Sequence, residues 1–61
     1  KGGGINHIGY EVSNIHEEIK ILEKKSFRLV TEPRPGLGHN NHLVCFLYSI
    51  KIGLIELVEK G

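Results

Sequence analysis

The chain has 61 residues, a formal net charge of +1 and one cysteine, Cys45. A domain this small buries only about 60% of the surface that its unfolded chain exposes, so a disulfide, a metal or a partner chain usually stabilises it. A lone cysteine excludes a disulfide within the chain, and the small net charge gives no indication of a nucleic-acid or membrane partner.

The sequence also gives expectations about the location of the protein and about whether the chain is a piece of a longer one. No apolar run approaches the about 20 residues of a membrane span, and no signal-peptide pattern is present. Together with a single cysteine of the reduced type, this favours a cytoplasmic location. Because the sequence starts with Lys1 and a run of glycines rather than with Met, we expect a piece of a longer polypeptide or a trimmed one.

Residues 5–12 predict the first strand, because apolar side chains alternate there with polar or small ones. One face of this strand carries Ile8, Tyr10 and Val12, and the other carries His7, Gly9 and Glu11. A lone histidine in a strand is more often a structural or solvent-facing residue, but together with Glu56 in the last apolar run His7 could form half of a metal site.

Residues 13–26 predict an amphipathic helix. Asn14 and Glu17 have the spacing of a capping box, and basic residues close the segment. Its apolar positions recur at i, i+4 and i+7, which is the narrow stripe of a helix packed on one side. The stripe consists of Ile15, Ile19 and Leu22.

The second half of the chain predicts three more strands. Residues 27–31 and 42–48 are rich in β-branched, aromatic and apolar residues, and residues 54–58 form the last apolar run. Residues 32–41 contain two prolines and two glycines, which predicts a loop, and residues 49–53 predict a turn. The predicted order is β-α-β-β-β, an α+β fold.

One helix can cover only one face of a four-stranded sheet. We expect the helix-facing residues to be Ile8, Tyr10, Val12, Ile55 and Leu57. The opposite face would carry His7, Glu11, Glu56 and either the odd or the even residues of the third strand. Such a face, polar in the centre and apolar at its edges, is typical of the wall of a cleft.

Four stretches, "GINHIGYEV", "EPRPGLGH", "VCFLYS" and "GLIELVEK", give the chain a resemblance that covers nearly its whole length. In this order and spacing they resemble the vicinal oxygen chelate superfamily of glyoxalase I, methylmalonyl-CoA epimerase and the bleomycin-resistance proteins. The chain is most similar to the C-terminal half of an epimerase or a related glyoxalase-like protein. The resemblance implies that residues 1–61 form one β-α-β-β-β module, half of a two-module domain.

The resemblance also implies a metal site. Family modules give one ligand from the first strand and one from the last, which are neighbours in the sheet, and the matching residues here are His7 and Glu56. Imidazole and carboxylate suit Co, Mn, Ni, Zn or Mg, with no choice among them from the sequence. The remaining ligands would come from a second module, or from a homodimer that brings two copies of each residue together.

Two functions compete on this basis. The first is a metal-dependent isomerase, epimerase or lyase that acts on a small carbonyl compound or a CoA thioester through a metal-stabilised enediolate, with Glu56 as a further candidate acid or base. The second is a module that binds a drug or antibiotic without chemistry, as bleomycin-resistance proteins do. Those proteins often lack the metal ligands, so His7 and Glu56 favour the enzyme.

Other residues have open interpretations. Glu59 has the chemistry of Glu56, but strand alternation places it on the opposite face. His39, in a glycine-rich loop, is either a substrate-binding residue or a solvated histidine. Tyr48 is a second substrate-binding candidate, at a point where epimerase-like sequences usually carry His-Pro. This departure, and the turn "SIKIG" after it, bear on recognition of a CoA ester.

The remaining histidines and the cysteine are expected to be structural. His16 falls in the first turn of the helix and His42 at the start of a strand, so both are expected at the surface. Cys45 lies in an apolar strand with no base placed near it by the sequence pattern, which favours a small core residue over a nucleophile.

Overall fold

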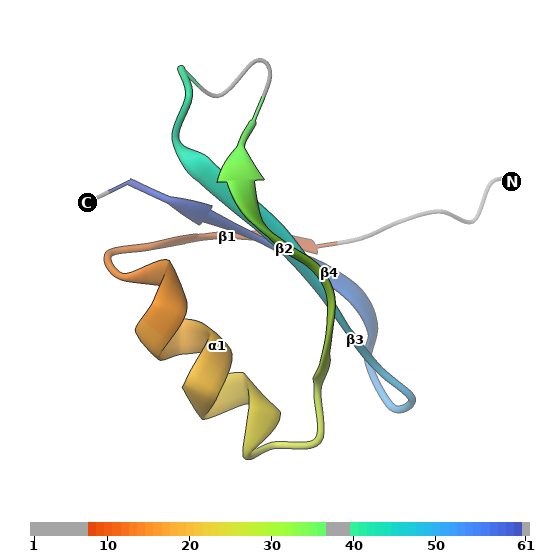
Figure 1. Cartoon of the computed structure of the whole chain (residues 1–61). Coiled ribbons are helices and arrows are strands. Elements are labelled where there is room, and N and C mark those ends of the chain that lie inside the picture. The colour runs from red at the N-terminus through yellow and green to blue at the C-terminus, as the bar shows by residue number, and fades with distance from the viewer. Residues whose placement is uncertain (1–7, 37–39, 61) are drawn as a thin grey trace, which may run out of the picture.

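The computed structural model describes residues 8–36 and 40–60. Its elements follow the predicted order of one strand, one helix and three strands (Figure 1). They are β1 (Ile8–Val12), α1 (Ile15–Glu23), β2 (Arg28–Pro35), β3 (Leu43–Ser49) and β4 (Gly53–Glu59). The predicted α+β module is confirmed.

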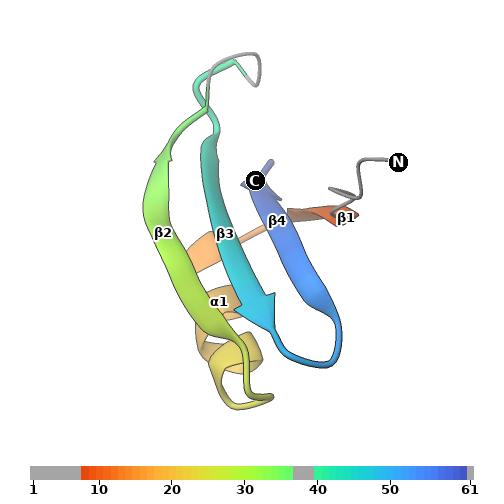
Figure 2. The same ribbon diagram turned by 90° about the vertical axis from the view of Figure 1, so that its right-hand side faces the viewer.

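The four strands form one mixed sheet in the order β1-β4-β3-β2. β1 and β4 are parallel neighbours, while β4, β3 and β2 are joined antiparallel. Figure 2 looks onto the sheet with α1 behind it, so the helix covers one face only. The first and last strands therefore lie side by side, as the resemblance implied.

The start of α1 is held by two side chains. The Asn14 side chain, in an extended residue, accepts a hydrogen bond from the Glu17 N–H at 3.1 Å, which confirms the predicted cap. The Ile15 N–H donates to Glu59 Oε2 at 3.0 Å, from the far end of the chain. A carboxylate here also faces the positive end of the helix dipole. The last strand thus fastens the helix to the sheet.

The core lies between α1 and the sheet, as the helix stripe predicted. It contains Ile15, Ile19, Phe27, Cys45, Leu47, Ile55 and Leu57. The predicted helix-facing residues Ile8 and Tyr10 lie on the side of Ile55 and Leu57, as expected. They do not join the buried core, because Ile8 is 53% and Tyr10 is 47% exposed on edge strand β1.

The predicted loop at residues 32–41 is wrong in its first part, because β2 continues to Pro35. β2 is an edge strand, and proline is tolerated at an edge, where its missing N–H needs no partner in the ladder. The register with β3 shifts between Leu29 and Thr31 and again before Arg34. Such irregularities bend a strand and re-aim its side chains.

The predicted turn between the last two strands is confirmed. Ser49 Oγ accepts hydrogen bonds from the N–H groups of Lys51 and Ile52, both at 3.2 Å. Gly53 closes the turn with φ +99°, a conformation that favours glycine. The turn fixes the register in which Phe46 faces Glu56.

Candidate metal and substrate site

The face of the sheet that α1 leaves uncovered, here called the open face, is defined by strand alternation. Cys45 and Leu47 are fully buried under the helix, so their neighbours along β3 point the other way. The open face consists of Val44, Phe46 and Tyr48 on β3 and Leu54, Glu56 and Val58 on β4. The sequence left the odd and even sets of the third strand open, and the structure assigns the even set to this face.

Glu56 lies near the middle of the open face, half-buried among apolar neighbours. Its register partners are Phe46 on β3 and Gly9 on β1. A Cβ added to Gly9 would stand 3.5 Å from Glu56 Oε1, so the carboxylate lies over the β1 backbone. Because Gly9 has no side chain, no Cβ of β1 stands against this oxygen.

Glu59, the alternative carboxylate, lies on the other side of β4. It accepts the Ile15 N–H and is half-buried beneath the helix. Its carboxylate thus holds the start of α1, and it does not lie on the open face. Alternation separated the two glutamates correctly.

His7, the predicted partner of Glu56, lies outside the described residues, as does His39. The described residues alone bring no three His, Cys, Asp or Glu side chains together in a way that could hold a metal ion. Glu56 can supply one hard oxygen donor, which fits a divalent cation but does not complete a site.

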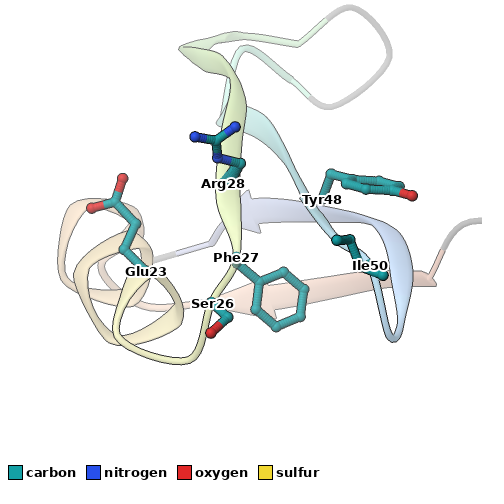
Figure 3. Close-up of a pocket in the computed structure, with 6 residues that line it drawn as sticks. All are labelled: Glu23, Ser26, Phe27, Arg28, Tyr48 and Ile50. Atoms are coloured by element: carbon teal, nitrogen blue, oxygen red, sulfur yellow. The ribbon is translucent and has the colours of Figure 1, made fainter.

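Tyr48 lies on the open face, one pair of residues away from Glu56. Its register partner on β4 is Leu54, so Tyr48 and Glu56 are diagonal neighbours, about 7 to 8 Å apart at this spacing. Tyr48 is 45% exposed and borders a hollow at the end of the sheet (Figure 3). That hollow is lined by Glu23, Ser26, Phe27, Arg28, Tyr48 and Ile50. Figure 3 shows Tyr48 and Ile50 on the side away from Glu23.

A second hollow, of about 570 Å³, lies along β2 and β3 and was missed from the sequence. It is lined by Val30, Thr31, Glu32, Arg34, Pro35, Gly36, Val44 and Phe46. The predicted loop over residues 32–41 is the reason why the hollow was not expected. Arg34 lies on a particular face of the sheet only because β2 continues through the prolines. The charged residue between Pro33 and Pro35 was the available signal.

The other histidines and the cysteine have structural positions. His16 is exposed on α1, as predicted, while His42 is half-buried just before β3 and its carbonyl accepts the Gly36 N–H at 3.0 Å. Cys45 is fully buried, and desolvation raises the pKa of its thiol to about 11. A thiol that stays protonated is a poor nucleophile, so the prediction of a core cysteine is confirmed.

Comparison with known proteins agrees with this architecture. The family model described as Glyoxalase/Bleomycin resistance protein/Dioxygenase superfamily matches residues 1–46. The chain belongs to this superfamily. It is also 40% identical, in an alignment of 60 positions that covers 95% of its length, to a protein of Dictyostelium discoideum named methylmalonyl-CoA epimerase, mitochondrial.

The match has a limited extent on the side of the relative. The chain spans 36% of the length of that epimerase. The name of the relative also places that protein in mitochondria, so a cytoplasmic location for this chain stays an expectation. Within residues 8–36 and 40–60, no helix has the length and apolar character that crossing a membrane requires.

Proposed function

We propose that the chain supplies half of the active site of a metal-dependent isomerase or epimerase that acts on a small carbonyl compound or a CoA thioester. The observation that carries the proposal is the position of Glu56, a half-buried carboxylate in an apolar face, beside a glycine on the neighbouring strand. A carboxylate oxygen is a donor that hard divalent cations prefer. The 40% identity to an epimerase supports the same chemistry.

Glu56 and His7 would hold the metal ion in this proposal. A bound divalent ion would supply Lewis-acid polarisation of a carbonyl oxygen. Glu56 would present one oxygen over Gly9, and its carboxylate is also the acid or base candidate for moving the proton on the carbon beside the carbonyl. Phe46 and the apolar residues around Glu56 would exclude water from that carbon.

A second module would complete the site. Strand β1 forms an edge of the sheet, and Ile8 and Tyr10 on it are about half exposed. Edge strands with exposed apolar residues are surfaces where another chain or segment adds. We therefore place either a second module or a second copy of this chain at β1, bringing the ligands that one module lacks.

A binding module without chemistry is the second candidate. The open face is largely apolar, with Val44, Phe46, Leu54 and Val58 around Glu56. Apolar lining with few polar groups is typical of sites that sequester a small molecule. In that case a drug or antibiotic would lie over Phe46, and Glu56 would contact a cationic group or donor of the ligand.

Metal uptake separates the two functions. Native mass spectrometry of the full chain with Mn, Co, Ni or Zn is expected to show one ion per assembled site, lost in Glu56→Ala and in His7→Ala. His16→Ala is the matched control, because His16 is exposed on α1 and should leave uptake unchanged.

Proton exchange then tests the reaction. The metal-loaded protein in D₂O is expected to exchange the proton at C2 of methylmalonyl-CoA, and Glu56→Gln is expected to remove this exchange. Metal uptake that survives Glu56→Ala, or an unchanged exchange rate in Glu56→Gln, would overturn the assignment of Glu56. Tight ligand binding without metal would favour the binding module.

A further inference from the structure

Arg34 shares the open face with Glu56. Strand pairing arranges the face in rows across the sheet, and one row joins Thr31, Phe46, Glu56 and Gly9. The next row joins Arg34, Val44, Val58 and Glu11. Arg34 is therefore two strands and one row away from Glu56, about 12 Å between Cα atoms at ordinary sheet spacings.

The hollow around Arg34 has the composition of a ligand subsite. Phe46 lines it and is also the register partner of Glu56, so one side chain borders the hollow and neighbours Glu56. Val44 and Pro35 give it an apolar part, and Arg34, which also lines it, is exposed. Among the described residues, no ion pair engages the Arg34 guanidinium.

The edge-strand irregularity is what aims this side chain. The register shift between Thr31 and Arg34 lets both residues pair with β3 on one face, although they are an odd number of residues apart. Thr31 Oγ1 accepts the Phe46 N–H at 3.2 Å, which fastens β2 to β3 beside the hollow. A regular strand would have turned one of the two away.

We propose that Arg34 binds an oxyanion of the ligand whose reacting carbon lies over Glu56, which makes it a specificity-determining residue. This inference rests on the proposed function. A guanidinium presents a planar fork of donors that matches a carboxylate or a phosphate. For a CoA thioester the oxyanion is either the free carboxylate of the acyl group or a phosphate of the carrier. Glu32 also lines this hollow, and its negative charge would repel the anion.

Binding to the full chain distinguishes these sources. Calorimetry with methylmalonyl-CoA and with propionyl-CoA, which keeps the thioester and phosphates but lacks the carboxylate, would compare the parent with Arg34→Gln. We expect Arg34→Gln to weaken methylmalonyl-CoA binding by about ten-fold or more. Arg34→Lys should recover part of it, since the charge returns without the fork, and Glu32→Gln should tighten it. Lys20→Gln, on the exposed side of α1, controls for the lost charge.

Each outcome decides one point. A loss confined to methylmalonyl-CoA assigns Arg34 to the acyl carboxylate, and an equal loss for both thioesters assigns it to a phosphate. If Arg34→Gln matches Lys20→Gln with every ligand, the inference is overturned.

A titration independent of turnover separates this inference from the proposed function. The NMR signal of the Arg34 Nε–H would be followed during addition of methylmalonate and of inorganic phosphate. The Arg34 signal could shift in a protein that neither takes up metal nor exchanges the C2 proton. That result would support Arg34 as an anion site and overturn the proposed reaction. No response to either anion or to either thioester would overturn the inference itself.

Discussion

The two faces of the sheet are built from the same strands but solve different problems. On the helix side, Cys45, Leu47, Ile55 and Leu57 are at most 3% exposed and close a continuous apolar core with α1. On the open face, their immediate neighbours Phe46 and Glu56 are only half-buried. On the helix side, the volume of a side chain matters most, because it must fill the core. On the open face, the groups that a side chain can contact matter more.

The comparison teaches where polar chemistry is tolerated in so small a domain. Glu59, on the helix side, is acceptable because it accepts the N–H that begins α1. Glu56, on the open face, lies over Gly9, which places no side chain against its oxygen. Of two glutamates three residues apart on one strand, Glu59 therefore holds the helix, while Glu56 lies on the open face, where the proposed site would be.

The largest effect is expected from a substitution that leaves a cavity on the helix side of the sheet. Leu47→Ala should lower the free energy of unfolding by about 2 to 5 kcal/mol, because Leu47 is fully buried and its removal leaves a cavity. Against a total stability of about 5 to 15 kcal/mol, this is severe. Urea unfolding followed by circular dichroism measures it. Ile50→Ala, at a site 91% exposed, should change stability by less than about 0.5 kcal/mol. Equal losses would contradict the assignment of the core.

A pH titration tests the same face through Cys45. Burial raises the pKa of its thiol from 9.0 to about 11, so above pH 9 the unfolded chain loses a proton that the folded chain keeps. Stability should therefore be intact below pH 9 and fall as the pH rises toward 11, by up to about 2 to 3 kcal/mol. Denaturant midpoints between pH 8 and 11 record the slope. Cys45→Ala should flatten it, and identical slopes in both proteins would refute the buried thiol.

The hydrogen bond that holds α1 to the last strand should contribute less to the free energy of unfolding. Glu59→Ala removes the acceptor for the Ile15 N–H and is expected to cost about 1 to 2 kcal/mol. Glu59→Gln keeps an oxygen acceptor without the charge and should cost less. Thermal unfolding of both variants measures the difference, and hydrogen exchange at Ile15 should be faster in Glu59→Ala. Unchanged exchange there would show that the contact does not persist in solution.

The smallest effect on stability is expected beside Glu56. An alanine Cβ at Gly9 would make an ordinary contact, 3.5 Å from Glu56 Oε1, so Gly9→Ala should shift the unfolding free energy by less than about 0.5 kcal/mol. Gly9→Leu should also fold but fill the space next to the carboxylate. Metal uptake and thioester binding are then expected to fall in Gly9→Leu and to persist in Gly9→Ala. Equal binding in both would place the ligand away from Gly9.

Much of the fold and part of the site follow from local patterns. Period-two alternation separated Glu56 from Glu59, the Asn14 cap marked the start of the helix, and the stripe of Ile15, Ile19 and Leu22 predicted its buried side. The limits of local reasoning appear at β2 and β1. The two prolines led the prediction to end β2 too early, and alternation alone could not tell that Tyr10 stays 47% exposed on the helix side.

Local patterns in the sequence are enough to predict the order of elements, the family and the opposite faces of Glu56 and Glu59. Periodicity, capping and motif order are each encoded within a few neighbouring residues. Only the tertiary structure decided which side of β3 is open, how far β2 runs and that Arg34 shares a face with Glu56. Those facts depend on strand pairing between distant segments. One register shift at an edge strand moves a side chain from one face of a sheet to the other, and no local pattern records it.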